Sequence, residues 1–223
     1  MANQKPGRDN FTRNLVIVVV VGVVLLMLVP TLISKGTKTS AKIPSSVSAS
    51  HGYGIVFNGD VTNVPVVDVY EDFQCPICQQ FEKMNGDYLE SLITAKKATV
   101  VYHTLSFLGP DSIRAANAGA CAADQGKFLD YHRTLYANQP AENSGAWTNL
   151  ALTILGPAAG ITDSKFGTCV AGGKYADWVT NVANAGAKAN VNATPTIFVN
   201  GKELDRKTEY FNPVKFKAAI ERG

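Results

Sequence analysis

The longest apolar run of the chain lies close to its N-terminus. Residues 15–29 read LVIVVVVGVVLLMLV, and no charged side chain occurs within residues 14–34. Twenty-one uncharged residues, at about 1.5 Å of helical rise each, span roughly the 30 Å hydrocarbon core of a bilayer. A cleavable signal peptide normally has a shorter apolar core, of about 7–15 residues, followed directly by a small-x-small site. We therefore expect an uncleaved transmembrane helix at residues 15–34, preceded by an N-terminal tail of residues 1–14.

A polar segment separates this apolar run from the rest of the chain. Residues 35–52 are rich in Ser, Lys, Thr and Gly, a composition typical of a flexible linker. Residues 53–223 contain no internal repeat and have the length of one ordinary domain.

The domain opens with a strand, a helix and a second strand. The β-branched run at residues 64–70 predicts a buried strand, and a shorter strand is expected at residues 54–57. Apolar residues then recur at helical spacing from residue 75 to about residue 97, and residues 98–107 return to a strand pattern. The intervening helix makes the two longer strands natural parallel neighbours.

The second half of the domain is predicted to be mostly helical. No strand pattern interrupts residues 109–190, within which residues 147–158 are expected to form one helix. A strand at residues 196–199, an Asn-Gly turn and a short partner strand at residues 202–204 follow. Residues 213–221 form the closing helix. The sequence therefore predicts an α/β domain with a helical insertion.

Composition and charge exclude several classes of protein. Hydrophobic residues make up 46% of the chain and charged residues only 17%, which excludes a chain that is disordered throughout. The net charge is +3. Residues 1–42 hold six basic residues and one acidic residue, so the remaining domain is slightly acidic. A nucleic-acid-binding domain normally carries its own basic patch, and this domain has none in its sequence.

Two of the four cysteines lie where a strand is predicted to become a helix. They form the sequence Cys75-Pro76-Ile77-Cys78. The free N–H groups and the positive dipole end of a helix stabilise a thiolate at Cys75, and Pro76 suits the first helical turn. A structural zinc site needs two further ligands, for which the sequence offers no second pair at metal-ligand spacing. A purely structural disulfide across so short a loop contributes little stability.

The other two cysteines, Cys121 and Cys169, both lie in the predicted helical block. One interpretation is a pair of buried free thiols that pack as small hydrophobic side chains. The other is a structural disulfide between two helices, which would contribute about 4 kcal/mol through loop entropy.

Three segments together resemble DsbA-like thiol–disulfide oxidoreductases. The stretch YEDFQCPIC at residues 70–78 is similar to their active-site segment, and residues 115–135 are similar to their inserted helical domain. The stretch ATPTIFVNG at residues 193–201 resembles the segment that carries the cis-proline of the thioredoxin fold. The resemblance covers nearly all of residues 53–223 and implies a thioredoxin fold with an inserted α-helical domain at about residues 109–190.

The resemblance also implies roles for individual residues. Cys75 would be the nucleophile and Cys78 its resolving partner. Pro195 would follow a cis peptide bond opposite the cysteines. The backbone of Thr194 would then pair with an extended substrate chain, as an added strand does. For Cys121 and Cys169, an exported location independently favours the structural disulfide, because disulfides persist in oxidising compartments.

The sequence departs from the family pattern at two positions. Within the active-site loop formed by Pro76 and Ile77, the best-known oxidases of the family have His where this chain has Ile77. Isoleucine donates no hydrogen bond to the thiolate, so we expect a less extreme oxidant. Val69 occupies the position where the fold often has a buried acid, and Glu71 is the candidate replacement as proton acceptor. The alternative is a solvent-exposed glutamate at the end of the strand.

The remaining histidines of the domain carry no recognisable motif. His103 lies on a predicted strand and His132 on a predicted helix, and neither has a partner that the sequence identifies. We interpret both as structural residues. The sequence contains no flavin or nucleotide motif, so no cofactor and no metal are expected.

The resemblance implies an oxidase held at the outer face of the cell membrane. Residues 1–14 would be cytoplasmic, since disulfide donation belongs outside the reducing cytosol. The substrates would be unfolded exported polypeptides that contain cysteine. A membrane partner, DsbB-like or related to vitamin K epoxide reductase, would reoxidise the pair. Two alternatives stay open: an isomerase or reductase kept reduced by a membrane donor, and a non-catalytic binding or chaperone module on the cell surface.

Overall fold

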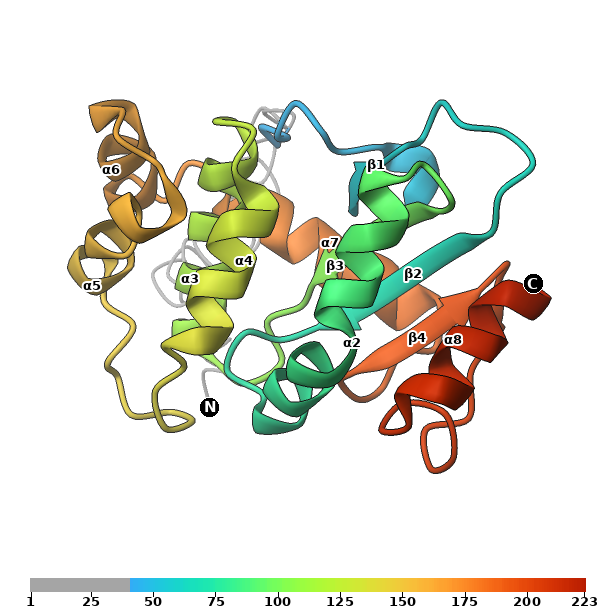
Figure 1. The fold of residues 1–223 in the computed structure, drawn as a ribbon. Coiled ribbons are helices and arrows are strands. Elements are labelled where there is room, and N and C mark those ends of the chain that lie inside the picture. The colour runs from blue at the N-terminus through green and yellow to red at the C-terminus, as the bar shows by residue number, and fades with distance from the viewer. Residues whose placement is uncertain (1–40) are drawn as a thin grey trace, which may run out of the picture. The chain divides into compact units, whose positions relative to one another are not determined.

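The computed structural model describes residues 41–223, which contain a central five-stranded mixed sheet (Figure 1). Its strands are β1 (Ile55–Phe57), β2 (Val66–Glu71), β3 (Thr99–Thr104), β4 (Thr196–Val199) and β5 (Lys202–Glu203), in the order β1-β3-β2-β4-β5. β2 and β3 are parallel, as predicted, and every other neighbouring pair is antiparallel. All six residues of β3 are buried, including the polar residues Thr99, His103 and Thr104.

Helices cover both faces of the sheet (Figure 1). α2 (Pro76–Thr94) and α8 (Pro213–Arg222) pack together on one face, and α7 (Ala176–Lys188) packs on the other. Because side chains alternate along a strand, neighbouring residues of β2 reach opposite faces. Glu71 therefore points toward the face that carries α2, whereas Asp68 and Tyr70 point toward the face that carries α7.

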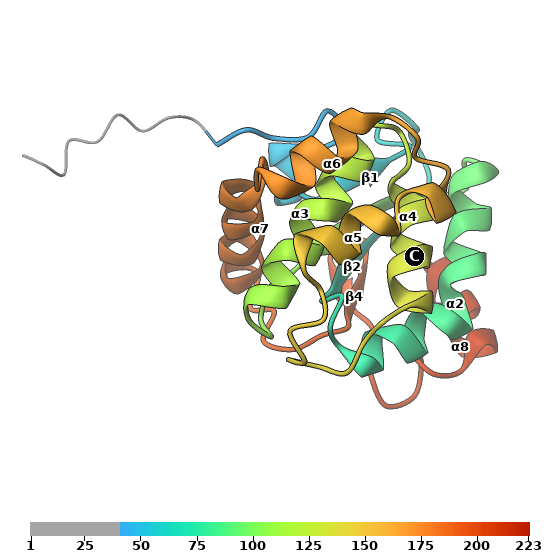
Figure 2. The same ribbon diagram turned by 90° about the vertical axis from the view of Figure 1, so that its left-hand side faces the viewer.

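Four helices of the insertion lie at one end of the domain (Figure 2). They are α3 (Pro110–Ala123), α4 (Phe128–Ala137), α5 (Asn149–Ile154) and α6 (Ser164–Ala171). The single helix expected at residues 147–158 is divided into α5 and a short 3-10 helix, Pro157–Ala159. The division falls before Pro157, because a proline disfavours helical geometry in the preceding residue and donates no backbone hydrogen bond.

The last part of the expected linker packs against the domain. Val47 forms an isolated antiparallel bridge with Ile55, and the backbone N–H of Val56 donates to the carbonyl oxygen of Ser46. A short 3-10 helix, Ala49–His51, follows. The assignment of residues 35–52 to a flexible linker is therefore wrong for its final part, because backbone pairing with β1 outweighs the polar composition.

The expected transmembrane helix at residues 15–34 lies outside the described residues, as does the tail of residues 1–14. Within residues 41–223, no helix has the length and apolar character that crossing a bilayer requires. The transmembrane anchor at residues 15–34 therefore stays a prediction from the sequence.

Candidate active site

Cys75 and Cys78 lie at the start of α2, directly after the loop that leaves β2. Cys75 is the N-cap residue of the helix and Pro76 is its first residue. Both cysteines are unbonded thiols; Cys75 is 7% exposed and Cys78 is fully buried. The backbone N–H of Cys75 donates to the carbonyl oxygen of Asp72, which fixes the turn into the helix.

The two thiols have opposite acidities. The pKa of Cys75 is lowered to about 6, chiefly because its sulfur accepts a hydrogen bond from Cys78, with further stabilisation at Thr194 and from backbone N–H groups at the helix start. The pKa of Cys78 is raised well above its usual value, first by burial and then by its hydrogen bond to Cys75 and the nearby charge of Glu71. At neutral pH, Cys75 is therefore a thiolate and Cys78 a thiol.

The loop before β4 reaches the nucleophile from the opposite side. The peptide bond between Thr194 and Pro195 is cis, as the resemblance implied. The Sγ atom of Cys75 lies 3.5 Å from the carbonyl oxygen of Thr194. The structure thus brings together residues that are more than one hundred positions apart in the sequence.

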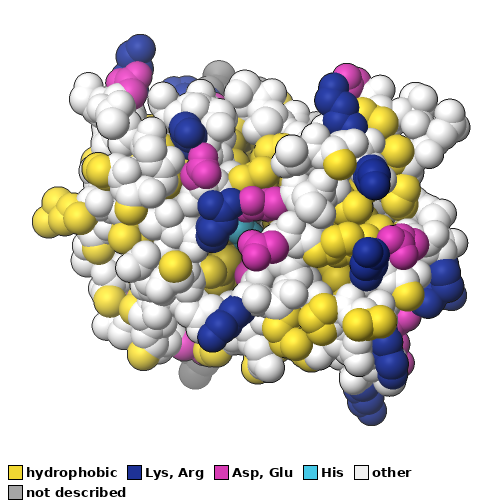
Figure 3. Space-filling view, in the orientation of Figure 1, with side chains coloured by type: hydrophobic (Ala, Val, Ile, Leu, Met, Phe, Trp, Pro, Cys, Tyr) yellow, Lys and Arg dark blue, Asp and Glu magenta, His cyan; other side chains and the backbone are white. Residues whose placement is uncertain are grey.

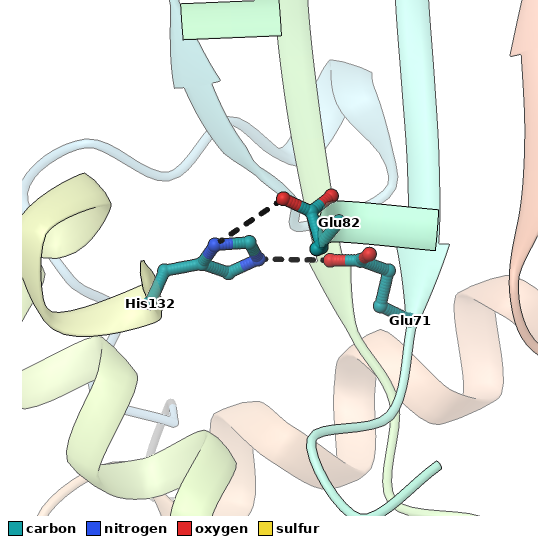
Figure 4. A group of neighbouring side chains, drawn as sticks. All are labelled: Glu71, Glu82 and His132. Atoms are coloured by element: carbon teal, nitrogen blue, oxygen red, sulfur yellow. Dashed lines mark hydrogen bonds and ion pairs between the residues drawn. The ribbon is translucent and has the colours of Figure 1, made fainter. Parts of the chain in front are cut away.

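A buried carboxylate–imidazole cluster lies near the two thiols (Figure 4). His132 of α4 faces Glu71 of β2 and Glu82 of α2, whose carboxylates lie beside each other (Figure 4). Its Nε2 atom is 2.8 Å from Oε2 of Glu71, and its Nδ1 atom is 3.9 Å from Oε2 of Glu82. Glu71 is only 2% exposed, which excludes the alternative of a solvent-exposed glutamate at the end of the strand.

The cluster includes two residues whose part in the site the sequence analysis did not find. The sequence analysis interpreted His132 as a structural residue without a partner, and so did not identify its contacts with Glu71 and Glu82. Glu82 lies four residues after Cys78, so the two share one face of α2. That spacing was the available signal, but only the tertiary fold places α4 against this face.

Burial raises the pKa of both glutamates in the cluster. The pKa of Glu71 reaches about 8, and that of Glu82 rises well above its usual value because burial and the charge of Glu71 add together. Burial lowers the pKa of His132 and keeps its ring neutral. The cluster therefore holds protons that carboxyl groups normally lose at neutral pH.

The same cluster is the only group among residues 41–223 whose ligand atoms lie near enough together for a metal ion, within 4.8 Å of one another. A metal site needs donor atoms that converge on one point. The imidazole instead presents Nε2 to one carboxylate and Nδ1 to the other, as Figure 4 shows. The contacts at both ring nitrogens suit an imidazole that exchanges protons with two carboxyl groups.

A second buried histidine lies on the opposite face of the sheet. His103 of β3 makes a 2.9 Å contact through Nε2 with Oδ1 of Asp68, and its ring stacks on Tyr70. The sequence analysis identified no partner for this histidine either. His103 therefore contacts one carboxylate, whereas His132 faces two.

Asp72 holds the start of α2 against the loop that follows β3. Its carboxylate accepts hydrogen bonds from the backbone N–H groups of Gln74 and Leu108 and from the hydroxyl of Ser112. Gln139, in the loop after α4, donates to the carbonyl oxygen of Cys75. The sequence analysis assigned no role to Asp72 or Gln139, and no sequence pattern marks Gln139.

The other cysteine pair is distant from this chemistry along the chain. Cys121 of α3 and Cys169 of α6 form a disulfide, with their Cα atoms 5.9 Å apart. The disulfide interpretation is therefore confirmed over that of two free thiols.

The fold and the site together define a thioredoxin-type protein, with a dithiol at a helix start opposite a cis-proline. The thioredoxin family model matches residues 53–222. The chain belongs to this family.

Solved structures agree with this assignment. MdbA of Actinomyces oris, described as a thiol-disulfide oxidoreductase, superposes with a TM-score of 0.69 at 22% identity, over 83% of this chain and 94% of that chain. At this identity the likeness shows the fold alone. DsbG and DsbA of Mycobacterium tuberculosis are each 30% identical over 81% of this chain. Their TM-scores are 0.63 and 0.62, and 84% and 89% of their chains are covered.

Curated relatives share only a portion of their length with the chain. The Na(+)/H(+) antiporter NhaA 3 of Salinispora tropica is 30% identical over 143 residues, which cover 62% of this chain and 20% of the antiporter. The serine/threonine-protein kinase PknE of Mycobacterium tuberculosis is 26% identical over 157 residues, or 65% of this chain and 28% of the kinase. The chain thus spans less than a third of these curated relatives.

Proposed function

We propose that the chain is a thiol–disulfide oxidoreductase that introduces disulfides into exported polypeptides through Cys75 and Cys78. The observation that carries this proposal is the opposite acidity of the two thiols at the start of α2. A thiolate with a pKa of about 6 is a good leaving group, and its stabilisation favours the reduced form of the pair. A protein whose reduced form is stabilised is a donor of disulfides.

The reaction proceeds through a mixed disulfide. A substrate thiolate attacks Sγ of Cys75, the Cys75–Cys78 bond breaks, and Cys78 leaves and takes up a proton. A second substrate thiolate then attacks the substrate sulfur of the mixed disulfide, and Cys75 leaves as a stable thiolate. The substrate loses two electrons, which the two cysteines of the enzyme hold as one thiolate and one thiol.

Glu71 is the proposed proton carrier for Cys78. Its carboxyl group is buried beside the site, and its pKa of about 8 lets it both donate and accept a proton near neutral pH. The charge of Glu71 contributes to the raised pKa of Cys78, which supports an interaction between the two groups.

Extended polypeptides fit the surroundings of Cys75. The backbone of Thr194 lies beside the nucleophile and is proposed to pair with an incoming chain as an added strand. Two exposed apolar side chains, Ile77 and Phe107, lie on the two segments that Asp72 connects. Backbone pairing and apolar contacts tolerate many sequences, which suits an enzyme that acts on unfolded chains.

The proposed setting is the outer face of the cell membrane. The apolar segment at residues 15–34 would anchor the domain there, with residues 1–14 in the cytoplasm. A membrane protein, DsbB-like or related to vitamin K epoxide reductase, would accept the two electrons and restore the Cys75–Cys78 disulfide. The relatives of known structure support the activity; the anchor and the electron acceptor are supported by the sequence alone.

Trapping of the mixed disulfide tests the function. In Cys78→Ser, the resolving thiol is absent, so a peptide that carries a reactive disulfide should remain covalently bound to Cys75. Mass spectrometry of the chain would show one peptide adduct per molecule, and the matched Cys75→Ser variant should show none. A non-catalytic binding module would bind the peptide equally well in both variants without an adduct.

A further inference from the structure

Cys78 and Glu71 have no direct route to bulk water. Cys78 is fully buried, and Glu71 is 2% exposed. The proposed reaction nevertheless requires Cys78 to gain a proton when the disulfide opens and to lose it when the disulfide re-forms. Because a bound substrate covers Cys75 during these steps, the proton needs a path that avoids the substrate side of the site.

His132 connects Glu71 with Glu82, which lies on the side of α2 that faces α4. Its Nε2 atom is within hydrogen-bond distance of Glu71, and its Nδ1 atom faces Glu82 at 3.9 Å (Figure 4). A neutral imidazole has one N–H group and one lone pair, so it can donate a proton at one nitrogen while it accepts at the other. Approach by about 1 Å would bring Glu82 into hydrogen-bond range.

Glu82 and His132 reach a cavity between α2 and α4. The cavity has a volume of about 440 Å³, and Gln79, Tyr102 and Tyr136 are also among its lining residues. In Figure 3, a histidine side chain is visible in a hollow bordered by basic and acidic side chains in this region of the surface. The far end of the cluster therefore opens toward solvent, while the near end is buried.

No fixed cation neutralises the two glutamates. Within residues 41–223, the only basic side chain paired with Glu71 and Glu82 is that of His132, whose ring is neutral, and the two carboxyl groups also interact directly with each other. Arg133 instead pairs with Glu90 and Asp130. The other charged or titratable groups near the cluster are Cys75 and Cys78 at the start of α2, Glu90 on α2, Asp72 after β2, Tyr102 on β3, and Arg133 and Tyr136 on α4. Lys83 and Asp87 of α2 line the same cavity and form no ion pair with the two glutamates. Protons are therefore the cations that balance the buried carboxylates.

We propose that His132 and Glu82 conduct protons between Glu71 and the cavity, so that Cys78 exchanges its proton with water behind the bound substrate. This inference rests on the proposed function of the chain. When Cys78 leaves as a thiolate, it takes the proton of Glu71. Glu71 takes the Nε2 proton of His132, Nδ1 of His132 takes the proton of Glu82, and water in the cavity returns a proton to Glu82.

The same path works in reverse when the disulfide re-forms. Cys78 then gives its proton to Glu71, and one proton leaves through Glu82. No electrons move along the path, since the electron pairs are exchanged at the sulfur atoms. His132 and Glu82 act through Glu71 and are positioning residues in this scheme.

Imidazole rescue tests the path directly. In the full chain, oxidised at Cys75–Cys78, we would measure single-turnover reduction by a cysteine-containing peptide, stopped with acid and followed by alkylation and mass. His132→Ala should slow this step by roughly 10²-fold, the usual range of general acid–base catalysis. Added imidazole should restore the rate with saturation, because His132 lines the cavity.

His103→Ala is the matched control, since it removes a buried histidine that pairs with one carboxylate on the other face of the sheet. Its rate should show no dependence on imidazole. A second variant, Glu82→Gln, keeps the shape of the side chain but carries no exchangeable carboxyl proton. It should slow the same step and flatten its pH dependence while circular dichroism stays unchanged.

Two results would overturn the proposal. One is that both variants react within twofold of the unaltered chain between pH 6 and pH 9. The other is that His132→Ala is slow but gains nothing from imidazole, which is the behaviour of a packing defect. If the unaltered chain fails to exchange disulfides with the peptide at all, the proposed function fails, and that outcome is visible before any variant is compared.

Discussion

The two cysteine pairs of this chain have the same chemical groups but different roles: one pair is proposed to exchange disulfides, and the other joins two helices. Cys75 and Cys78 are separated by two residues at a helix start, beside the carbonyl oxygen of Thr194 and a buried acid. Cys121 and Cys169 are 48 positions apart and connect two helices of the insertion. Local electrostatics determine the reactivity of the first pair. The second pair stabilises the fold, because its long closed loop lowers the chain entropy of the unfolded state.

The comparison shows that surroundings decide which sulfurs react. At the first pair, the helix N-terminus and the Cys78 thiol lower the pKa of one sulfur, while burial raises the pKa of the other. The second pair closes a bond between α3 and α6, and no thiol remains to titrate. Exchange chemistry and structural stability should therefore be separable by mutation.

Removal of the nucleophile should have the largest effect. Cys75→Ser should reduce peptide oxidation by about 10³-fold or more, equivalent to at least about 4 kcal/mol of transition-state stabilisation. Its free energy of unfolding should change little, because serine fills nearly the same space. Turnover of a dithiol peptide and urea unfolding measure the two quantities. Substantial turnover in this variant would move the chemistry away from the helix start.

Loss of the Cys121–Cys169 disulfide should lower the stability of the protein and leave its oxidation rate nearly unchanged. The double variant Cys121→Ala with Cys169→Ala should lose about 4 kcal/mol of stability, given the length of the loop. Its peptide oxidation rate, measured well below the unfolding transition, should stay within twofold of the unaltered chain. A large loss of rate in a still-folded protein would show that the two regions are coupled.

The pH dependence of alkylation should distinguish the two active-site thiols. A lowered pKa favours the reduced form through the Cys75 thiolate; this contribution is fully present above the usual thiol pKa, near 9, and is lost as the pH falls through about 6. Iodoacetamide should therefore label Cys75 with a midpoint near pH 6 and about tenfold more slowly for each unit below it. Cys78 should remain unlabelled at neutral pH. A midpoint near pH 9 would remove the proposed asymmetry.

The loop between the two thiols should tune their chemistry by a smaller amount. Ile77 is exposed and donates nothing to Cys75. Ile77→His adds a donor, and a hydrogen bond worth about 1.4 kcal/mol would raise the reduction potential by about 30 mV. Glutathione equilibration measures this shift, with Ile77→Leu as the control of similar size. An unchanged or lower potential in the histidine variant would show that the side chain does not reach the thiolate.

Local patterns in the sequence predicted most of the fold. The strands β2 and β3, the helix after Cys75 and the Asn-Gly hairpin all follow from periodicity and turn chemistry, which operate over a few residues. The break before Pro157 was missed because the flanking residues continue a helical pattern. The pairing of Val47 with Ile55 was missed because a polar composition does not reveal which backbone groups find a partner.

The candidate site likewise contains residues that local motifs predict and residues that only tertiary packing brings together. The sequence identified Cys75, Cys78, Thr194 and Pro195 through motifs, and it raised Glu71 as an acid. It did not place His132 or Glu82 beside Glu71, because the contact depends on how α4 packs against α2. Interactions of this kind are tertiary, and a single sequence carries little direct information about them.

The reduction potential of the Cys75–Cys78 pair tests the central claim most directly. The full chain would be equilibrated in glutathione buffers and its thiols counted by alkylation and mass, with Cys121 and Cys169 scored separately. The account predicts a value between about −120 and −180 mV, the range of disulfide donors. A value near about −270 mV, typical of a thioredoxin-like reductant, would contradict the assignment as an oxidase.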